Sequence, residues 1–424
     1  MRTRSQTGAL SACLVFALAL SIAACHKENT NSVSGPGINT PLDLPAGSST
    51  VTAAANQFAF NLFQQLLQSG SVPANTLISP LSIYQALSMT YNGAAGTTAD
   101  SMAATLGLAG LPVGELNALS KAILQQMPKE DSKVQFSPAN SIWYRQNGPQ
   151  PSPAFVDTVT TDYLGTAQAL DFASPSAVNT INSWVAKNTE NKIPTILNSL
   201  ESNAEMVLVN AIFFNGSWLN AFKPGDTQDA PFYFADGSSV SVPFMNEQVG
   251  LRVYRGPVYT LAELPYGTGK AFDMYLVIPN STTQPIQQFA ASFNADSLAN
   301  GMPHLDSENV KLTIPKWSYS YSVDDLSPEL SKLGMGIAFS NDANFANMYP
   351  NTPSAISRVI HKTWIQVSES GTQAAAATAV VVVETVVGAG PPLLRADHPF
   401  VYVITEKQTG MILFIGILND PSQH

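Results

Sequence analysis

The pattern of apolar and polar positions predicts a mixed chain whose helices come mainly early and whose strands come mainly late. A first helix is predicted to end before Gly70, because apolar residues upstream repeat on one helical face: Phe58, Leu62, Phe63, Leu66 and Leu67. Pro80 suits the first turn of a second helix that runs towards Asn92. Helical spacing predicts further helices over residues 97–107, 113–127, 177–197 with a break at Pro194, and 326–333.

Runs of strand length dominate the second half of the chain. A continuous apolar run over residues 206–214 predicts a strand that is buried on both faces. Shorter runs bounded by turn residues predict strands over residues 134–145, 232–234, 240–244, 251–254, 259–264, 274–278, 310–314 and 356–367. Residues 401–405 and 411–418 predict a closing hairpin. Because we find no internal repeat and no second linker, we expect one mixed domain over residues 51–424.

Composition and charge then remove several classes of function. The 424 residues are 12% charged, which is about half the usual fraction for soluble domains. The net charge of −10, without a basic run beyond the first few residues, excludes a nucleic-acid partner. The two cysteines, Cys13 and Cys25, lie at the N-terminus, which excludes a disulfide framework, a Cys-based zinc site and a Cys nucleophile. Because neither a G-x-S-x-G nor an H-E-x-x-H motif occurs, we expect no enzyme activity, no metal and no cofactor.

The N-terminus predicts an export signal over residues 1–24. Arg2 and Arg4 precede an apolar run, residues 10–24, that is too short to span a bilayer. The sequence I-A-A-C that ends at Cys25 resembles the bacterial lipobox, which implies cleavage before Cys25 and lipid on its sulfur. The alternative is an ordinary secretory signal with an incidental cysteine. Residues 25–50 are rich in Asn, Ser, Thr, Gly and Pro and are predicted to form a flexible tether.

The predicted lipid also sets the expected location. A multiply acylated Cys25 would anchor the protein to a membrane, because two or more chains give lasting attachment. His26 follows the cysteine, where Asp is associated with inner-membrane retention. We therefore expect an outer-membrane lipoprotein whose domain faces the periplasm or the cell surface.

One segment near the C-terminus has an unusual composition. Residues 372–379 are almost all small, residues 380–383 are valines, and residues 388–392 break any strand or helix. Small residues suit a segment that slips between two neighbours, and alternation places neutral side chains on both of its faces. Composition alone also fits an ordinary buried strand or an aggregation-prone stretch.

The same segment resembles the hinge of the serpin family. Residues 369–378, E-S-G-T-Q-A-A-A-A-T, are similar to the family's E-E-G-T-E-A-A-A-A-T. Further blocks resemble the family in its order, at residues 75–83, 181–193, 208–227, 263–266, 361–362, 396–400 and 413–416. The resemblance covers the chain from about residue 55 to the C-terminus. Gln373, Asn191 and Ile417 depart from the usual Glu, Gly and Arg, and none lies where it would block insertion of a loop.

The resemblance implies a mixed α+β serpin fold with three β-sheets, about eight or nine helices and an exposed reactive-centre loop. It implies a monomeric, single-use inhibitor of a protease. The protease attacks the loop and forms an acyl-enzyme; the cleaved loop then inserts into the main sheet and distorts the protease before hydrolysis is complete. The alternative is a non-inhibitory serpin-fold binding or chaperone module, a class that tends to have a charged or bulky hinge.

The resemblance also assigns residues to sites. The hinge is Glu369, Gly371, Thr372, Ala374, Ala375, Ala376, Ala377 and Thr378. Family spacing puts the scissile bond at Thr385–Val386, with Glu384–Thr385 and Val386–Val387 as neighbouring alternatives. A Thr among valines suits an elastase-like serine protease, whereas a cut after Glu384 would indicate a glutamate-preferring one.

Two structural clusters complete the implied site. The polar cluster beneath the point where the sheet opens, the shutter, is matched by Ser79, Ser82, Asn210 and His361. Trp218 matches the aromatic residue at the top of the sheet, the breach, although plain core packing explains it equally well.

Overall fold

The computed structural model describes residues 41–69, 75–201, 204–267, 271–350, 352–372 and 390–423. The expected signal peptide, Cys25 and most of the tether lie outside these residues. So do the expected hinge residues Ala374, Ala375, Ala376, Ala377 and Thr378, and the candidate cleavage residues Glu384, Thr385, Val386 and Val387. Within the described ranges no helix combines the length and apolar character that crossing a membrane requires.

The described ranges contain nine α-helices. They are α1 (Ser48–Gln68), α2 (Pro80–Tyr91), α3 (Gly96–Leu106), α4 (Val113–Gln126), α5 (Pro153–Thr161), α6 (Pro175–Asn188), α7 (Ile286–Ser292), α8 (Ala295–Gly301) and α9 (Ser327–Leu330). The folded part begins earlier than the expected boundary at residue 51. Helix α1 begins at Ser48, and Leu42 and Leu44 already pack on the core.

Six strands form the sheet that carries the site. In spatial order they are β10 (Trp317–Val323), β11 (Val359–Ser368), β12 (Gly371–Thr372), β4 (Met206–Ser217), β2 (Val134–Arg145) and β3 (Thr166–Leu170). Strand β4 is buried along residues 206–214, as its apolar run predicts. Because successive side chains point to opposite faces, Leu208 and Ile212 join one core cluster, whereas Val207 and Val209 join the other.

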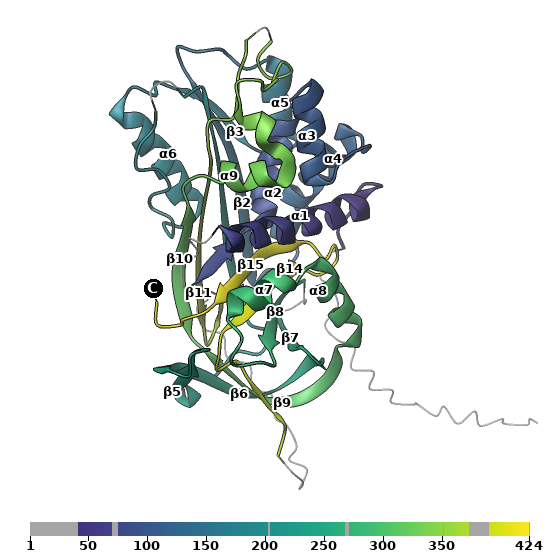
Figure 1. Ribbon diagram of the computed structural model, residues 1–424, viewed down its shortest axis with the longest axis vertical. Helices are drawn as coiled ribbons and strands as arrows, with labels where there is room; N and C mark the ends of the chain where they lie inside the picture. Colours follow the sequence, from purple (N-terminus) through teal and green to yellow (C-terminus); the bar gives the residue numbers. More distant parts are fainter. Residues whose placement is uncertain are drawn as a thin grey trace, which may run out of the picture. The chain divides into compact units, whose positions relative to one another are not determined.

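A helix covers each face of this sheet beside β4. Ile181 and Val185 of α6 pack in the same cluster as Val207 and Val209. Leu87 of α2 belongs to the main core cluster on the opposite face. Figure 1 shows α6 and α2 on the two sides of β10 and β11. Between these two helices the sheet is therefore a buried layer, and a strand added there must be apolar or small on both faces.

The other strands are joined through one long strand. Their order is β1 (Thr76–Ile78), β15 (Ile412–Leu418), β14 (Phe400–Glu406), β8 (Phe272–Pro279), β7 (Tyr259–Pro265), β6 (Ser239–Arg255), β9 (Asp306–Pro315) and β13 (Leu393–Arg395), with β5 (Gln228–Tyr233) also on β6. The first part of β6 pairs with β5 and its last part pairs with β7. The expected mixed α+β fold is confirmed. Three β-sheets were expected, but hydrogen bonds along β6 join two of them into one continuous group of strands.

Two expected element boundaries are wrong. The helix predicted to reach residue 197 ends at Asn188, because Glu190 and Asn191 adopt positive φ angles of 49° and 60° that no right-handed helix allows. The two short strands predicted over residues 240–244 and 251–254 are one strand, β6, since residues 245–250 continue to pair with β9.

Candidate functional site at the opening of the six-stranded sheet

Strands β4 and β11 run parallel but pair directly at one end only. Val359 lies opposite Leu208, and Ile360 lies opposite Val209. Beyond these residues the two strands do not pair with each other anywhere in the described ranges. At the far end the chain turns back after β11, and β12 lies between the two strands. The sheet is thus closed at one end of this strand pair and opened at the other.

Two hinge residues, Gly371 and Thr372, occupy the opening. Thr372 pairs with Val367 of β11 on one side and with Gly216 of β4 on the other. Gly371 pairs with Ser217 and has a φ of 145°, and a Cβ atom on it would lie 2.1 Å from the carbonyl oxygen of Gly216. Glycine is therefore required where the chain enters the sheet.

Aromatic side chains cover the threonine that follows. Thr372 is 4% exposed, and its hydroxyl forms a hydrogen bond with the Tyr266 hydroxyl. Burial raises the pKa of Tyr266 well above its usual value, so that hydroxyl keeps its proton. The Trp218 ring stacks on Tyr266, with ring centroids 4.5 Å apart. Among the described residues, the Thr372 side chain thus lies under an apolar cover and forms one hydrogen bond, to the Tyr266 hydroxyl.

The turn before β12 is held by hydrogen bonds from the chain that follows β4. Trp218 donates from its backbone N–H to the Ser370 carbonyl and from Nε1 to the Ser368 carbonyl, each at 3.0 Å. The backbone N–H of Phe222 donates to the Glu369 carbonyl at 2.9 Å. Trp218 therefore has a second role besides core packing, since it binds the turn from which the hinge begins.

The Glu369 side chain adds an ion pair to this turn. Its carboxylate lies 2.9 Å from Lys316 Nζ and accepts a hydrogen bond from Thr227 Oγ1 at 2.8 Å. Burial acts to raise the pKa of Glu369, but the hydrogen bonds from Lys316 and Thr227 outweigh it and hold that pKa below its usual value. The hinge therefore starts from a fixed anchor.

The expected shutter residues lie where direct pairing of β4 and β11 stops. Asn210 and His361 are the next residues after Val209 and Ile360. The backbone N–H of Ser79 donates to His361 Nε2 at 3.1 Å, and the Asn210 amide donates to Asn140 Oδ1. Ser82 Oγ and Asn210 Oδ1 are buried and have no hydrogen-bond partner within the described residues. The structure brings Ser79 and His361 into contact and leaves two polar atoms of the cluster unsatisfied.

Comparison with known proteins identifies this architecture. A profile of the family described as "Serpin (serine protease inhibitor)" matches residues 53–421. The chain belongs to the serpin family. Serpins are in general protease inhibitors rather than enzymes.

Similar serpins span almost the whole chain. An uncharacterised serpin-like protein of Thermococcus kodakarensis is 30% identical, with 96% of this chain and 98% of the relative covered. The thermophilic serpin tengpin in its native state is 27% identical with a TM-score of 0.80, covering 90% of this chain and 96% of that chain. Human thyroxine-binding globulin complexed with thyroxine is 27% identical with a TM-score of 0.81, covering 89% of this chain and 100% of that chain.

The ion pair between Lys316 and Glu369 at the hinge is expected to contribute measurably to the free energy of unfolding. Because the Lys316 side chain is 38% exposed, solvent screening limits the coupling between Lys316 and Glu369 to about 1 kcal/mol. A double-mutant cycle with Lys316→Met and Glu369→Gln, read by urea unfolding, measures it. The more exposed pair Arg255–Glu308 is the matched control and should couple more weakly. If the effects of the two hinge substitutions on the free energy of unfolding were simply additive, this ion pair would not anchor the hinge.

Burial of the shutter histidine, His361, predicts that the protein loses stability as the pH becomes acidic. Burial lowers the pKa of His361 from 6.5 to about 3, so the native protein binds fewer protons than the unfolded chain between these values. Stability is therefore complete above pH 6.5 and falls as the pH drops, by up to about 1.4 kcal/mol per pH unit. His361→Gln, which keeps an acceptor for the Ser79 N–H, should flatten that fall in melting curves between pH 3 and 6.5. His304→Gln at an exposed position should not.

Sequence reasoning missed the partners of the hinge. Lys316 and Thr227 hold Glu369, and Asn140 binds Asn210, yet neither Lys316 nor Asn140 belongs to a block that resembles the family. Tyr266 belongs to such a block, but nothing in the block relates it to Thr372, from which it is 106 residues distant in sequence. These contacts depend on chain crossings that a single sequence does not display.

Proposed function

We propose that this serpin irreversibly inhibits a serine protease by inserting its cleaved reactive loop between β4 and β11. The observation that carries the proposal is the opening of the sheet: beyond Ile360 and Val209, the only chain found between the two strands in the described ranges is Gly371–Thr372. Gly371–Thr372 thus begins a strand at one end of this opening. The small residues of the hinge follow directly in the sequence.

The register of the first residues supports insertion of the rest. Thr372 runs antiparallel to both neighbours, opposite Gly216 and Val367. Continued in that register, residue 378 comes opposite Asn210 and His361, and residue 379 comes opposite Val209 and Ile360. The small-residue stretch therefore has the length of the open stretch, and the valines would replace the direct pairing of β4 with β11.

The alternation of faces in this register fits the hinge composition. Thr378 would lie on the same face as Thr372, where its hydroxyl meets the unsatisfied atoms Asn210 Oδ1 and Ser82 Oγ. Gln373 would point to the other face, beside the exposed side chain of Gln366. The departure of Gln373 from the usual Glu is therefore harmless, since a neutral polar side chain there stays in contact with solvent.

The proposed target is an elastase-like serine protease cut at Thr385–Val386. The test is incubation with elastase-like, trypsin-like, subtilisin-like and papain-like proteases, followed by SDS gels and mass spectrometry of the released C-terminal peptide. We expect an SDS-stable complex with the elastase-like enzyme and a new N-terminus at Val386. Cleavage by every protease without any stable complex would instead support the non-inhibitory alternative.

We also propose that the mature protein is a lipoprotein held at the outer membrane through Cys25. The support is the I-A-A-C sequence after a short apolar run. Labelling with a radioactive fatty acid should mark the wild-type protein and leave Cys25→Ser unlabelled. A labelled Cys25→Ser variant would contradict the anchor.

A further inference from the structure

Two buried carboxyl groups meet at the end of strand β14. Glu130 follows the short turn after α4 and is 1% exposed, and Glu406 is the last residue of β14 and is fully buried. The two side chains are in hydrogen-bonding contact. Glu130 Oε2 is buried and receives no hydrogen bond from a donor in the described residues. Two carboxylates in contact repel each other strongly, so one proton shared by the Glu130–Glu406 pair supplies the hydrogen bond that two bare carboxylates lack.

The charged groups around this carboxyl pair do not compensate it. Neither member forms an ion pair with a Lys or Arg of the described ranges; Lys407 is bound instead by two other carboxylates, those of Glu263 and Asp273, at 2.8 and 3.0 Å. Asp131 adds a further negative charge beside the pair. Asp43, near the start of the described chain, is exposed and negative as well. The pair therefore depends on its proton, rather than on a cation, to stay buried.

One glutamine side chain links the pair to the N-terminal part of the chain. Gln408 Nε2 donates to Glu130 Oε1 at 2.5 Å, and Gln408 Oε1 accepts a hydrogen bond from the backbone N–H of Leu42 at 3.0 Å. The backbone N–H of Gln408 donates to Glu406 Oε1. Gln408 therefore contacts both members of the pair and the chain that precedes α1.

The chain that precedes α1 lies across a joint between two elements. Asp43 exchanges two hydrogen bonds with the Gln126 side chain of α4, at 2.7 and 2.8 Å, and Leu42 and Leu44 pack on the core. Residues 41–47, the N-terminal segment, thus bind α4 on one side and the turn after β14 on the other. The pair closes the same joint from inside, since one member follows α4 and the other ends β14.

We propose that the Glu130–Glu406 pair is a proton-dependent latch for the N-terminal segment. With one proton shared, the pair stays buried and binds Gln408, which in turn binds the segment. Loss of that proton in mildly alkaline solution leaves two charges without a cation, and the joint opens so that water can reach them. The latch therefore releases residues 41–47 as the pH rises.

The direction of this pH dependence follows from the pKa of Glu130 in the closed and the opened form. Burial, and then the charge of Glu406, raises the pKa of Glu130 from 4.5 to about 8, and burial raises the pKa of Glu406 as well. Between these values the closed form binds more protons than the opened one. The latch is therefore tightest below pH 4.5 and is lost as the pH rises towards 8, and the equilibrium constant for opening increases by up to about tenfold per pH unit. His361 changes stability only below pH 6.5, so the window from pH 6.5 to 8 separates the two effects.

Release of the segment would extend the proposed tether. Residues 41–47 join the rest of the tether to α1, and once freed they add up to about 25 Å of reach. The domain would thus reach further from the membrane at pH 8 than at pH 6.5. This consequence rests on the proposed lipid anchor at Cys25, whereas the latch itself does not.

Hydrogen exchange of the N-terminal segment in the full-length protein tests the latch. The protection factor of the peptide that covers residues 41–47, corrected for the intrinsic effect of pH on exchange, is followed from pH 6.5 to 8. In the wild type we expect it to fall by roughly tenfold over this range. In Glu130→Gln, which cannot ionise and still offers an acceptor to Gln408 Nε2, it should stay constant.

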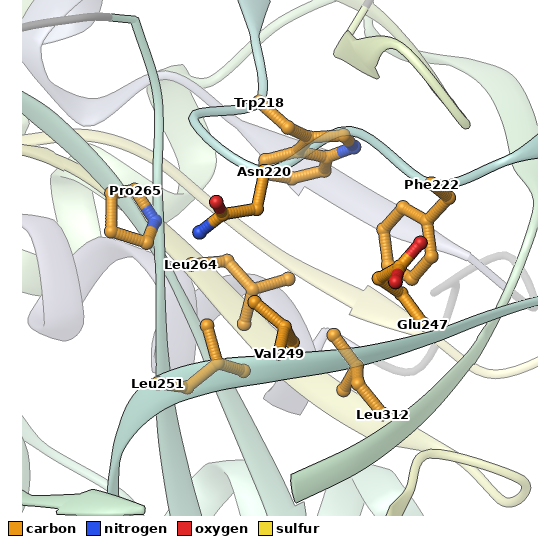
Figure 2. A pocket seen from close by; sticks show the side chains of 9 residues that line it. All are labelled: Trp218, Asn220, Phe222, Glu247, Val249, Leu251, Leu264, Pro265 and Leu312. Atoms are coloured by element: carbon orange, nitrogen blue, oxygen red, sulfur yellow. The ribbon is translucent and has the colours of Figure 1, made fainter. Parts of the chain in front are cut away.

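Glu247→Gln is the matched control for Glu130→Gln. Figure 2 shows Glu247 beside Trp218 and Phe222. Its partly buried carboxylate lies 3.6 Å from Lys223 Nζ, so this group has a cation, and the variant should show the same fall in protection as the wild type. Gln408→Met, which removes the link between the segment and the pair, should lower the protection of the segment at pH 6.5 already.

Each result decides the proposal. A protection factor that stays constant with pH in the wild type, an equal fall in Glu130→Gln, or wild-type protection in Gln408→Met at pH 6.5 would overturn the latch. Urea unfolding of the wild type is a second measurement that needs no variant. Its equilibrium constant for unfolding should rise from pH 6.5 to 8, and a constant that stays level or falls would overturn the shared proton. Neither measurement depends on protease inhibition.

Discussion

Thr372→Arg is expected to convert this serpin from an inhibitor into a substrate. Thr372 is the second residue to enter the sheet, is 4% exposed and contacts the buried Tyr266 hydroxyl. An Arg there would place a charge in an apolar layer before any other part of the loop could follow, which costs several kcal/mol. We expect the protease to be released with its activity intact, and the SDS-stable complex to be lost, in a titration of protease by inhibitor.

Gln373→Arg is the matched control for this substitution. It adds the same side chain one position later, on the face that the register places beside the exposed Gln366. Because a charge at that position stays in solvent, this variant should trap protease as the wild type does. If Thr372→Arg trapped protease at the wild-type ratio, or if both variants failed equally, insertion in this register would be refuted.

Cleavage of the reactive loop is expected to raise the melting temperature sharply. Insertion would add roughly 15 residues to the sheet, and at about 1 kcal/mol net for each ladder hydrogen bond the gain is on the order of 10 kcal/mol. A gain of that size corresponds to a rise of at least about 10 °C. The measurement is calorimetry before and after the loop is nicked by a protease that is not trapped.

The nicked Thr372→Arg variant supplies the control for this prediction. Its loop is cut in the same place but is not expected to enter the sheet, so its melting temperature should stay near that of the uncut protein. A nicked wild-type protein that melts where the uncut protein melts would show that cleavage releases no stability and that no trap operates.

The parts of the fold that could be predicted from sequence are those written in local patterns. The apolar run of β4 predicted burial on both faces, and both core clusters use its side chains. The hydrophobic spacing of α1 and the Pro80 start of α2 also predicted their helices correctly. Strand β10 was missed although its sequence, W-S-Y-S-Y-S-V, alternates with period two, so the signal was present and unused.

Other features depend on tertiary structure and left no local signal. The end of α6 follows from left-handed residues at 190 and 191, where the helical pattern of apolar residues continues. The partial opening between β4 and β11 depends on where the two strands stop pairing, which is after Val209 and Ile360, two residues that lie 151 positions apart in the sequence.

Hydrogen exchange of the loop before and after cleavage tests the central claim most directly. The peptide that covers residues 373–383 is followed by mass spectrometry in the uncut and the nicked protein. Our account predicts fast exchange before the cut and strong protection afterwards, because the segment becomes a strand between β4 and β11. Equal exchange in the two forms, whether fast or slow in both, would contradict it.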